Sequence, residues 1–329
     1  MNKMNMIILT VAIAFVAGII AAKFWIPALS RLKAGGSIRE EGPKWHMSKQ
    51  GTPIMGGLIF ITALIVALVV MYFVSAKGSE VHGSVLLVLT VLSLINGVIG
   101  FIDDYVKVKK HRNLGLTVIQ KLALQIAASV CFLLLLRNMG YISSGLYIPF
   151  AKVWISLPWF VYMIIGAFII VGCVNAVNLT DGVDGLATGV TMPVCVFFIA
   201  AAISRENLSV AVFAAALLGG LGAFLVFNFN PAKIFMGDTG SLFLGGAVAA
   251  MSFALDMPVI LIPVGIVYIC EALSVILQVG YFKLTHGKRI FKMSPLHHHF
   301  EMCGWKEKKV FAVFTIVCAL GCIVGYLGI

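Results

Sequence analysis

Five aspartates lie at the ends of strongly apolar stretches, where a carboxylate needs a chemical or a structural reason. Asp103 and Asp104 end one stretch, Asp181 and Asp184 follow another, and Asp238 precedes a third. An ionised aspartate inside a membrane helix costs roughly 2.5–3.5 kcal/mol on insertion scales. Carboxylates spaced i,i+1 and i,i+3 offer hard oxygen ligands, and Mg²⁺ commonly takes one or two of them while phosphate and water complete its octahedron. The aspartates therefore predict a magnesium site that acts on phosphate groups.

A structural interpretation competes with this one. An aspartate near a membrane boundary is often a solvated loop residue or a helix cap. Five of them, set among asparagines and glycines in otherwise apolar sequence, favour a shared functional site instead.

Two lysines stand near these carboxylates in the sequence. Lys107 comes three residues after Asp104, and Lys121 lies one turn into the next apolar stretch with Gln125 four residues later. Both ammonium groups are able to neutralise phosphate. For Lys121 the alternative is a side chain that extends to the membrane interface.

Three consecutive histidines, His297 to His299, precede Phe300 and Glu301. Consecutive helical residues point about 100° apart and cannot easily share one zinc ion. Imidazoles that donate hydrogen bonds to a diphosphate, or that carry a proton, fit better, and an exposed polar loop is the alternative. The sequence contains no GxxxxGK[ST] or GxSxG motif, which disfavours a P-loop ATPase and an α/β-hydrolase.

The elements that must position these residues are membrane helices. The chain has 329 residues, of which 61% are hydrophobic and 11% charged, with a mean hydropathy of +1.05. This composition leaves too little polar surface for a water-soluble globule. Continuous apolar runs of bilayer-spanning length favour helices over a β-barrel, whose strands alternate. We expect an all-α integral membrane protein with ten spans, at 5–28, 54–75, 84–102, 117–136, 158–177, 186–203, 208–228, 239–256, 258–282 and 310–328.

Basic residues orient these spans. With the N-terminus outside, the cytoplasmic segments hold seventeen Lys and Arg against five on the opposite face, a clear positive-inside bias. All five aspartates then share the cytoplasmic face, although no carboxylate entered that count. The net charge of +11 follows from this topology and gives little support for nucleic-acid binding. The predicted cytoplasmic segments are 29–53, 103–116, 178–185, 229–238 and 283–309.

We expect residues 1–329 to form a single polytopic membrane domain with a retained first helix, both termini outside and the active site on the cytoplasmic face. The external segment 137–157 predicts a small hairpin. Segment 283–309 mixes basic and aromatic residues in a way that suits the membrane surface. Glu271 and Gln278 share one face of the ninth span and either line a cavity or bond neighbouring helices, with Gln278 the better functional candidate. The seven cysteines show neither a disulfide framework nor a CxxC zinc site.

Several segments together resemble the polyprenyl-phosphate N-acetylhexosamine-1-phosphate transferases, and within them the phospho-N-acetylmuramoyl-pentapeptide transferase branch. The Asp-Asp-Tyr triplet and the segment with Asp181 and Asp184 are shared across that superfamily, whereas the His-His-His-Phe-Glu run with Gly304 and Trp305 is similar to the branch. The resemblance covers nearly the full chain through GTPIMGG, GFIDDYVK, NAVNLTDGVDGLA, FNFNPAKIFMGDTGSL, SPLHHHFE and GWKE.

This resemblance implies ten transmembrane helices, a multi-pass place in the bacterial inner membrane and a homodimer. The implied reaction transfers phospho-MurNAc-pentapeptide from UDP-MurNAc-pentapeptide to undecaprenyl phosphate, with Mg²⁺ as cofactor, and yields lipid I and UMP. One departure is Ile54, which offers no hydroxyl at a position where the family usually has Thr.

The resemblance also implies roles by position. Asp238 is the expected Mg²⁺ ligand, Asp103 and Asp104 are the essential pair and candidate further ligands, His297 is catalytic or contacts phosphate, and Phe235 stacks on uracil. The residues expected to line the nucleotide cleft are Lys49, Lys107, Lys121, Asn178, Asp181, Asp184, Asn228, Gln278 and His298.

Three alternatives stay open at this point. Asp103 either deprotonates the lipid phosphate for direct attack, which we favour, or a carboxylate attacks first to form a covalent intermediate. A sister transferase would use UDP-GlcNAc as its donor. An ion-coupled transporter would place its ionisable residues near the membrane midplane, whereas these carboxylates gather at one face.

Overall fold

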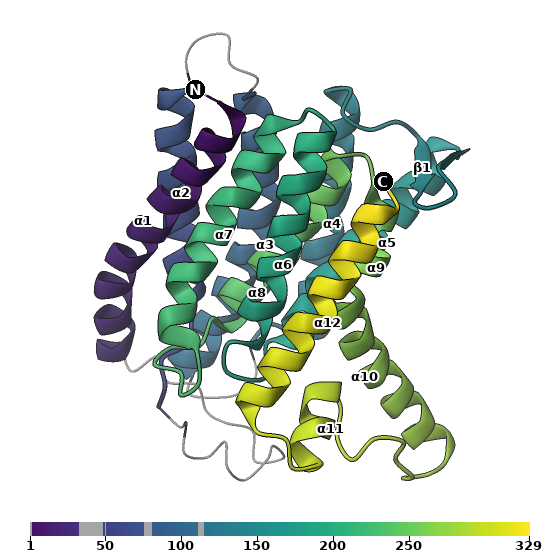
Figure 1. Ribbon diagram of the computed structural model, residues 1–329. Coiled ribbons are helices and arrows are strands. Elements are labelled where there is room, and N and C mark those ends of the chain that lie inside the picture. Colours follow the sequence, from purple (N-terminus) through teal and green to yellow (C-terminus); the bar gives the residue numbers. More distant parts are fainter. Residues whose placement is uncertain (1, 33–48, 50, 76–80, 111–114) are drawn as a thin grey trace.

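The computed structural model describes residues 2–32, 49, 51–75, 81–110 and 115–329. Long helices dominate this part of the chain, and they stand side by side as a bundle (Figure 1). The helices are α1 (Lys3–Arg31), α2 (Gly57–Val74), α3 (Gly83–Lys110), α4 (Val118–Asn138), α5 (Trp159–Thr180), α6 (Leu186–Ser204), α7 (Leu208–Asn228), α8 (Gly237–Ala254), α9 (Leu261–Val264), α10 (Ile266–Leu284), α11 (Leu296–Met302) and α12 (Glu307–Leu327).

Nine of the described helices are long and apolar enough to cross a membrane. They correspond to nine of the ten predicted spans, and the all-α membrane fold expected from composition is thus confirmed. The remaining span, predicted at 239–256, corresponds to α8, which has 18 residues and a more polar first turn. The count of ten and the orientation of the bundle stay predictions.

Helix α8 is the central element of the bundle. Its side chains from Thr239 to Ala254 are all buried, and it packs against α2, α3 and α5. Small residues make up much of its sequence, which lets neighbouring backbones approach closely without a hydrophobic driving force from water. The chemistry-bearing residue Asp238 stands in the first turn of this enclosed helix.

Gly100 of α3 lies directly against the backbone of α8. A Cβ atom built at Gly100 would collide with the backbone carbonyl of Asp238, and one at Gly97 would press on Phe243. Glycine at position 100 therefore sets the distance between the aspartates of α3 and the start of α8.

We expect Gly100→Ala to lower the free energy of unfolding by about 1–3 kcal/mol, because the added methyl must push backbone apart in a packed interface. The same shift separates the carboxylates on the two helices, so activity should fall with stability. Gly172→Ala is the matched control, since a Cβ at Gly172 meets nothing within 4 Å. Thermal unfolding of the detergent-solubilised variants checks this, and equal midpoints for both variants would contradict it.

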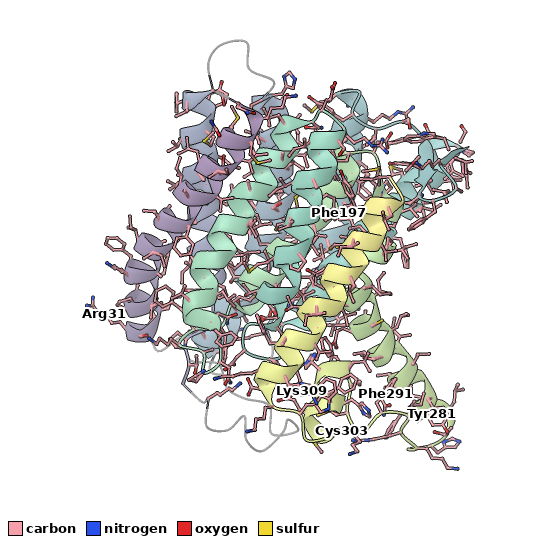
Figure 2. All side chains as sticks on the ribbon, viewed as in Figure 1. Arg31, Phe197, Tyr281, Phe291, Cys303 and Lys309 are labelled. Carbon is pink, nitrogen blue, oxygen red and sulfur yellow. The ribbon has the colours of Figure 1, made fainter. Side chains whose placement is uncertain are left out.

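The two ends of the bundle carry different residues. The end where α3 finishes and α8 begins carries the aspartates, and we call it the aspartate end. Arg31, Cys303 and Lys309 lie toward this end in Figure 2. At the other end α1 begins and α12 finishes (Figure 1), which agrees with an expectation that both termini share one face.

The hairpin predicted in 137–157 is present. Strands β1 (Gly145–Ile148) and β2 (Val153–Ser156) pair antiparallel, with Gly145 opposite Ser156 and Ile148 opposite Val153. The turn is fastened to the end of α12, because the Phe150 N–H donates to the Gly328 carbonyl at 3.0 Å.

The predicted span 258–282 differs from one continuous helix. The chain forms a 3₁₀ turn at Pro258–Ile260, then α9, then α10 after a break at Gly265. Proline at position 263 and glycine at position 265 explain the break, since proline removes a backbone donor and glycine weakens a helix. Beyond the break α10 runs away from the bundle, and α11 lies between it and α12 (Figure 1).

Candidate active site

Three of the five aspartates that were predicted to share a site lie close together. Oxygen atoms of Asp103, Asp104 and Asp238 all lie within 4.8 Å of one another, although the residues come from two helices more than 130 positions apart in sequence. Asp103 and Asp104 are 1% exposed and Asp238 is partly exposed. The aspartates of α3 lie inside the helix, not beyond it, because α3 continues to Lys110.

Asp104 holds the first turn of α8. Its carboxylate accepts hydrogen bonds from the Asp238 N–H at 3.2 Å, the Thr239 N–H at 2.9 Å and the Thr239 hydroxyl at 2.7 Å. The first N–H groups of a helix lack partners within the helix and favour negative charge nearby. Gly237, with φ of +69°, brings the chain into α8 at this point. Asp104 thus places Asp238 against α3.

Two lysines neutralise the carboxylates. Lys107 Nζ lies 2.6 Å from Asp103 Oδ2 and 2.9 Å from Asp238 Oδ2. Lys121 Nζ, from α4, lies 2.6 Å from Asp238 Oδ2 and 3.4 Å from Asp103 Oδ1. Lys121 therefore turns toward the carboxylates, in contrast to the alternative of extending to the interface.

Asn178, in the last turn of α5, completes the surroundings of Asp238. Its Nδ2 donates to Asp238 Oδ1 and to Ser241 Oγ, both at 2.8 Å. The Asp238 carboxylate thus receives hydrogen bonds from three other helices, α3, α4 and α5. The site exists only in the assembled bundle.

Asp181 follows directly after α5. Burial and the negative charges of Asp238, Asp104 and Asp184 raise its pKa well above the ordinary value. The four carboxylates therefore act as one electrostatic cluster, which favours a cation in their midst.

Asp184 anchors the connection between α7 and α8. It lies 2.7 Å from Lys49 Nζ and accepts hydrogen bonds from Asn230 Nδ2 at 3.1 Å and the Ala232 N–H at 2.9 Å. Lys49 also pairs with Glu307 at 2.6 Å. Sequence reasoning missed Asn230 and Glu307 as site residues. Asn230 lies in the segment FNFNPAKIFMGDTGSL and Glu307 in GWKE, both of which carry the family resemblance.

The histidine run forms α11, a short helix, and so differs from the exposed-loop alternative. His297 is 1% exposed, and its Nδ1 lies 3.1 Å from Glu271 Oε2 of α10. His298 Nδ1 lies 2.7 Å from Glu301 Oε2. The rings of His297 and His298 have centroids 4.2 Å apart, yet their Nδ1 atoms face different glutamates, and His299 Nδ1 accepts the Lys292 N–H.

Three further predicted residues are held by local contacts. Gln278 Oε1 accepts hydrogen bonds from the Ile290 and Phe291 N–H groups, at 3.1 and 2.9 Å. Asn228 Nδ2 donates to the Ile234 carbonyl at 2.9 Å. The backbone of Phe235 bonds to Pro53 and Gly56, at 2.8 Å each, and leaves its ring half-buried. These contacts order the segments on which the site is built.

The arrangement combines anionic oxygens with ammonium donors in a partly enclosed place. Carboxylates from α3 and α8 are suited to a hard divalent cation. Ammonium groups from α3 and α4 are suited to phosphate oxygens. A site of this composition stabilises charge that develops on a phosphoryl group and its leaving group.

Comparisons with known proteins agree with this chemistry. Residues 86–256, which contain all five aspartates, match the family model described as glycosyl transferase family 4. The chain is 46% identical over 322 residues to a phospho-N-acetylmuramoyl-pentapeptide-transferase of Listeria monocytogenes, covering 98% of each. Proteins of the same name from Clostridium acetobutylicum and Staphylococcus carnosus are 45% and 47% identical over 328 and 326 residues. These matches cover 99% and 98% of this chain, and 100% and 98% of the respective relatives.

Proposed function

The chain belongs to the phospho-N-acetylmuramoyl-pentapeptide transferase family, and we propose that it makes lipid I and UMP from UDP-MurNAc-pentapeptide and undecaprenyl phosphate. This is the first membrane step of peptidoglycan synthesis, carried out by a multi-pass protein of the bacterial inner membrane. The predicted homodimer rests on the family resemblance and stays a prediction.

One observation carries this proposal beyond the family relationship. Asp103, Asp104 and Asp238 converge with Lys107 and Lys121 at the end of a membrane bundle. A lipid acceptor approaches from the bilayer and a nucleotide from water, so the two meet at such an end. The convergence suits a reaction between two phosphate groups, which repel each other unless they are screened.

We propose that Mg²⁺ is the cofactor and that Asp238 is its principal protein ligand. The donor set fits, since carboxylate oxygens are the ligands that Mg²⁺ prefers. Asp103 is the better second ligand, because both oxygens of Asp104 already accept hydrogen bonds from the start of α8. Bound Mg²⁺ would supply charge neutralisation for the transferring phosphoryl group and for the leaving UMP.

The protein's own residues have distinct tasks in this proposal. Lys107 and Lys121 bring ammonium groups beside the carboxylates, where they screen the repulsion between donor and acceptor phosphates. Asn178 fixes the direction of the Asp238 carboxylate. We propose that the half-buried ring of Phe235 stacks on uracil. The other proposed nucleotide-binding residues are Lys49, Asp181, Asp184, Asn228, Gln278 and His298, with His297 as a catalytic or phosphate-contacting residue.

We favour direct attack by the acceptor phosphate over a covalent intermediate. A phosphate monoester has a second pKa of about 6 and is largely anionic at neutral pH, so a carboxylate nucleophile gains little. Asp103 pairs with Lys107 at 2.6 Å, which holds it beside the site as a counter-charge or proton acceptor.

The test of this function compares donors. Purified protein is incubated with undecaprenyl phosphate and either UDP-MurNAc-pentapeptide or UDP-GlcNAc, and the lipid product is identified by mass spectrometry. We expect product from the muramoyl nucleotide alone. Product from UDP-GlcNAc alone would assign the chain to the sister activity, and solute flux in liposomes without UMP release would indicate a transporter.

Metal removal gives a second expected result. Chelation with EDTA should lower UMP release by at least about 100-fold, since the phosphates then lack their principal neutralising charge. Added Mg²⁺ should restore it. The rate of UMP release is measured in EDTA, and again after EDTA has been removed by dialysis and Mg²⁺ has been added. Full turnover in the presence of the chelator would exclude the proposed cofactor.

A further inference from the structure

We propose that Glu271 is a positioning residue for the reaction: it fixes the tautomer and direction of His297, so that Nε2 faces the turn between α5 and α6. The inference rests on the proposed function, because His297 is assigned there to the substrate. Nothing in the sequence pattern links the two residues, which are 26 positions apart.

The contact between them is double. Glu271 Oε1 accepts the backbone N–H of His297 at 3.2 Å, and Oε2 lies 3.1 Å from Nδ1 of its ring. Glu271 has no exposed surface, and His297 is 1% exposed. A carboxylate so buried is costly without partners, and here both oxygens have one. The pair therefore fixes the start of α11 against α10 and orients the imidazole at the same time.

The other ring nitrogen has a different environment. His297 Nε2 is buried and has no hydrogen-bond partner among the described residues. It faces Gly182, where an added Cβ would collide with Nε2. Gly182 lies between Asp181 and Val183, in the same turn as Asp184. Nε2 is thus directed into the turn that carries two of the five aspartates.

The geometry assigns the ring proton. A backbone N–H only donates, so Oε1 acts as an acceptor, and a carboxylate at Oε2 is also an acceptor. Nδ1 must then carry a proton and donate it to Oε2. A histidine whose Nδ1–H is held by a carboxylate presents Nε2 to its target in a fixed direction. Without Glu271 the ring is free to rotate and to change tautomer.

A purely structural tie between α10 and α11 is the competing explanation, and a double-mutant cycle separates the two. Glu271→Gln keeps the size of the side chain but offers one acceptor where two are needed. We expect this variant to lower kcat by about 10- to 100-fold with KM changed less than about threefold. In a His297→Ala background the same change should cost less than about twofold, because its effect passes through the imidazole.

Ser274→Ala is the matched control on α10. Ser274 is buried one turn from Glu271, and its hydroxyl donates to the Glu271 backbone carbonyl, away from the imidazole. We expect activity within about twofold of the unaltered protein. If the losses from Glu271→Gln and His297→Ala multiply in the double variant, the positioning role is wrong.

Side-chain ¹⁵N NMR tests the proton assignment on the unaltered protein itself, and a variant is needed only to identify the signal. The protein is labelled at histidine, and His297→Ala identifies the signal. We expect a proton on Nδ1, and a ring protonated at Nε2 alone would overturn the proposal. An unaltered protein that releases no UMP, yet shows Nδ1 protonated, would instead refute the proposed function.

Discussion

Asp238→Asn is expected to lower UMP release by about 1,000-fold, toward the background rate. The substitution preserves the size of the side chain but removes the charge that meets Lys107 and Lys121 at 2.9 and 2.6 Å. Loss of one electrostatic contact to a developing charge typically costs about 100- to 1,000-fold, and a lost metal ligand adds to this. Steady-state UMP release at saturating substrates and Mg²⁺ measures the effect.

The fold should survive this change. Asp238 has 17% of its side chain exposed, whereas the rest of α8 after it is buried. Asp256→Asn is the matched control, because Asp256 lies beyond the opposite end of α8 and bonds to Ser143 there. It should retain activity within about twofold. Near-normal turnover by a well-folded Asp238→Asn protein would refute the proposed metal ligand.

Asp103→Asn is expected to lower kcat by about 100-fold with a small change in KM. Asp103 faces both lysines, at 2.6 Å from Lys107 and 3.4 Å from Lys121, and also accepts the Leu116 N–H at 2.7 Å. Asparagine leaves both ammonium groups without this counter-charge, so their positions relative to the phosphates are lost. Initial rates over a range of both substrates separate kcat from KM.

Asp104→Asn provides the comparison. Both oxygens of Asp104 accept hydrogen bonds from the first turn of α8, and an amide replaces one acceptor by a donor. This variant should unfold at a lower temperature, since hydrogen bonds to a charged group contribute about 1.5–3 kcal/mol each. Asp103→Asn should unfold at a higher temperature than Asp104→Asn, because Asp103 accepts one backbone N–H, from Leu116, whereas Asp104 accepts three hydrogen bonds from α8. The reverse order of thermal stability would contradict these two assignments.

Much of the site was predictable because membrane insertion limits where charge is found. The cost of burying a carboxylate in lipid made each aspartate conspicuous, and the basic residues indicated one face for all five. The structure brings three of them within 4.8 Å, with the two lysines selected from the sequence beside them. Such convergence follows from helix ends that meet at a common level.

Roles that depend on a specific partner were not predictable. Asp184 bonds to Lys49 and Asn230, from segments 135 residues before and 46 residues after it. The sequence favours Gln278 over Glu271 as a functional residue, because Gln278 lies nearer the predicted cytoplasmic end of the ninth span. Its pairing with His297 depends on how α11 folds back against α10, which periodicity does not encode.

The break in the predicted span 258–282 was also missed from the sequence. Hydropathy counts apolar residues over a window and therefore joined Pro258–Ile260, α9 and α10 into one helix. Pro263 and Gly265 were visible in the sequence as helix-breaking residues. Since α10 carries Glu271 and Gln278, its separate course determines where those side chains reach.

The most direct test of the central claim follows the β-phosphate of the donor. UDP-MurNAc-pentapeptide labelled with ³²P at the β position is incubated with the purified protein, undecaprenyl phosphate and Mg²⁺. If the chain transfers the sugar together with its phosphate, the label appears in the lipid product, in equal amount to unlabelled UMP, and Asp238→Asn forms neither. Label released in UDP or as inorganic phosphate, or no lipid product from the unaltered protein, would contradict this account.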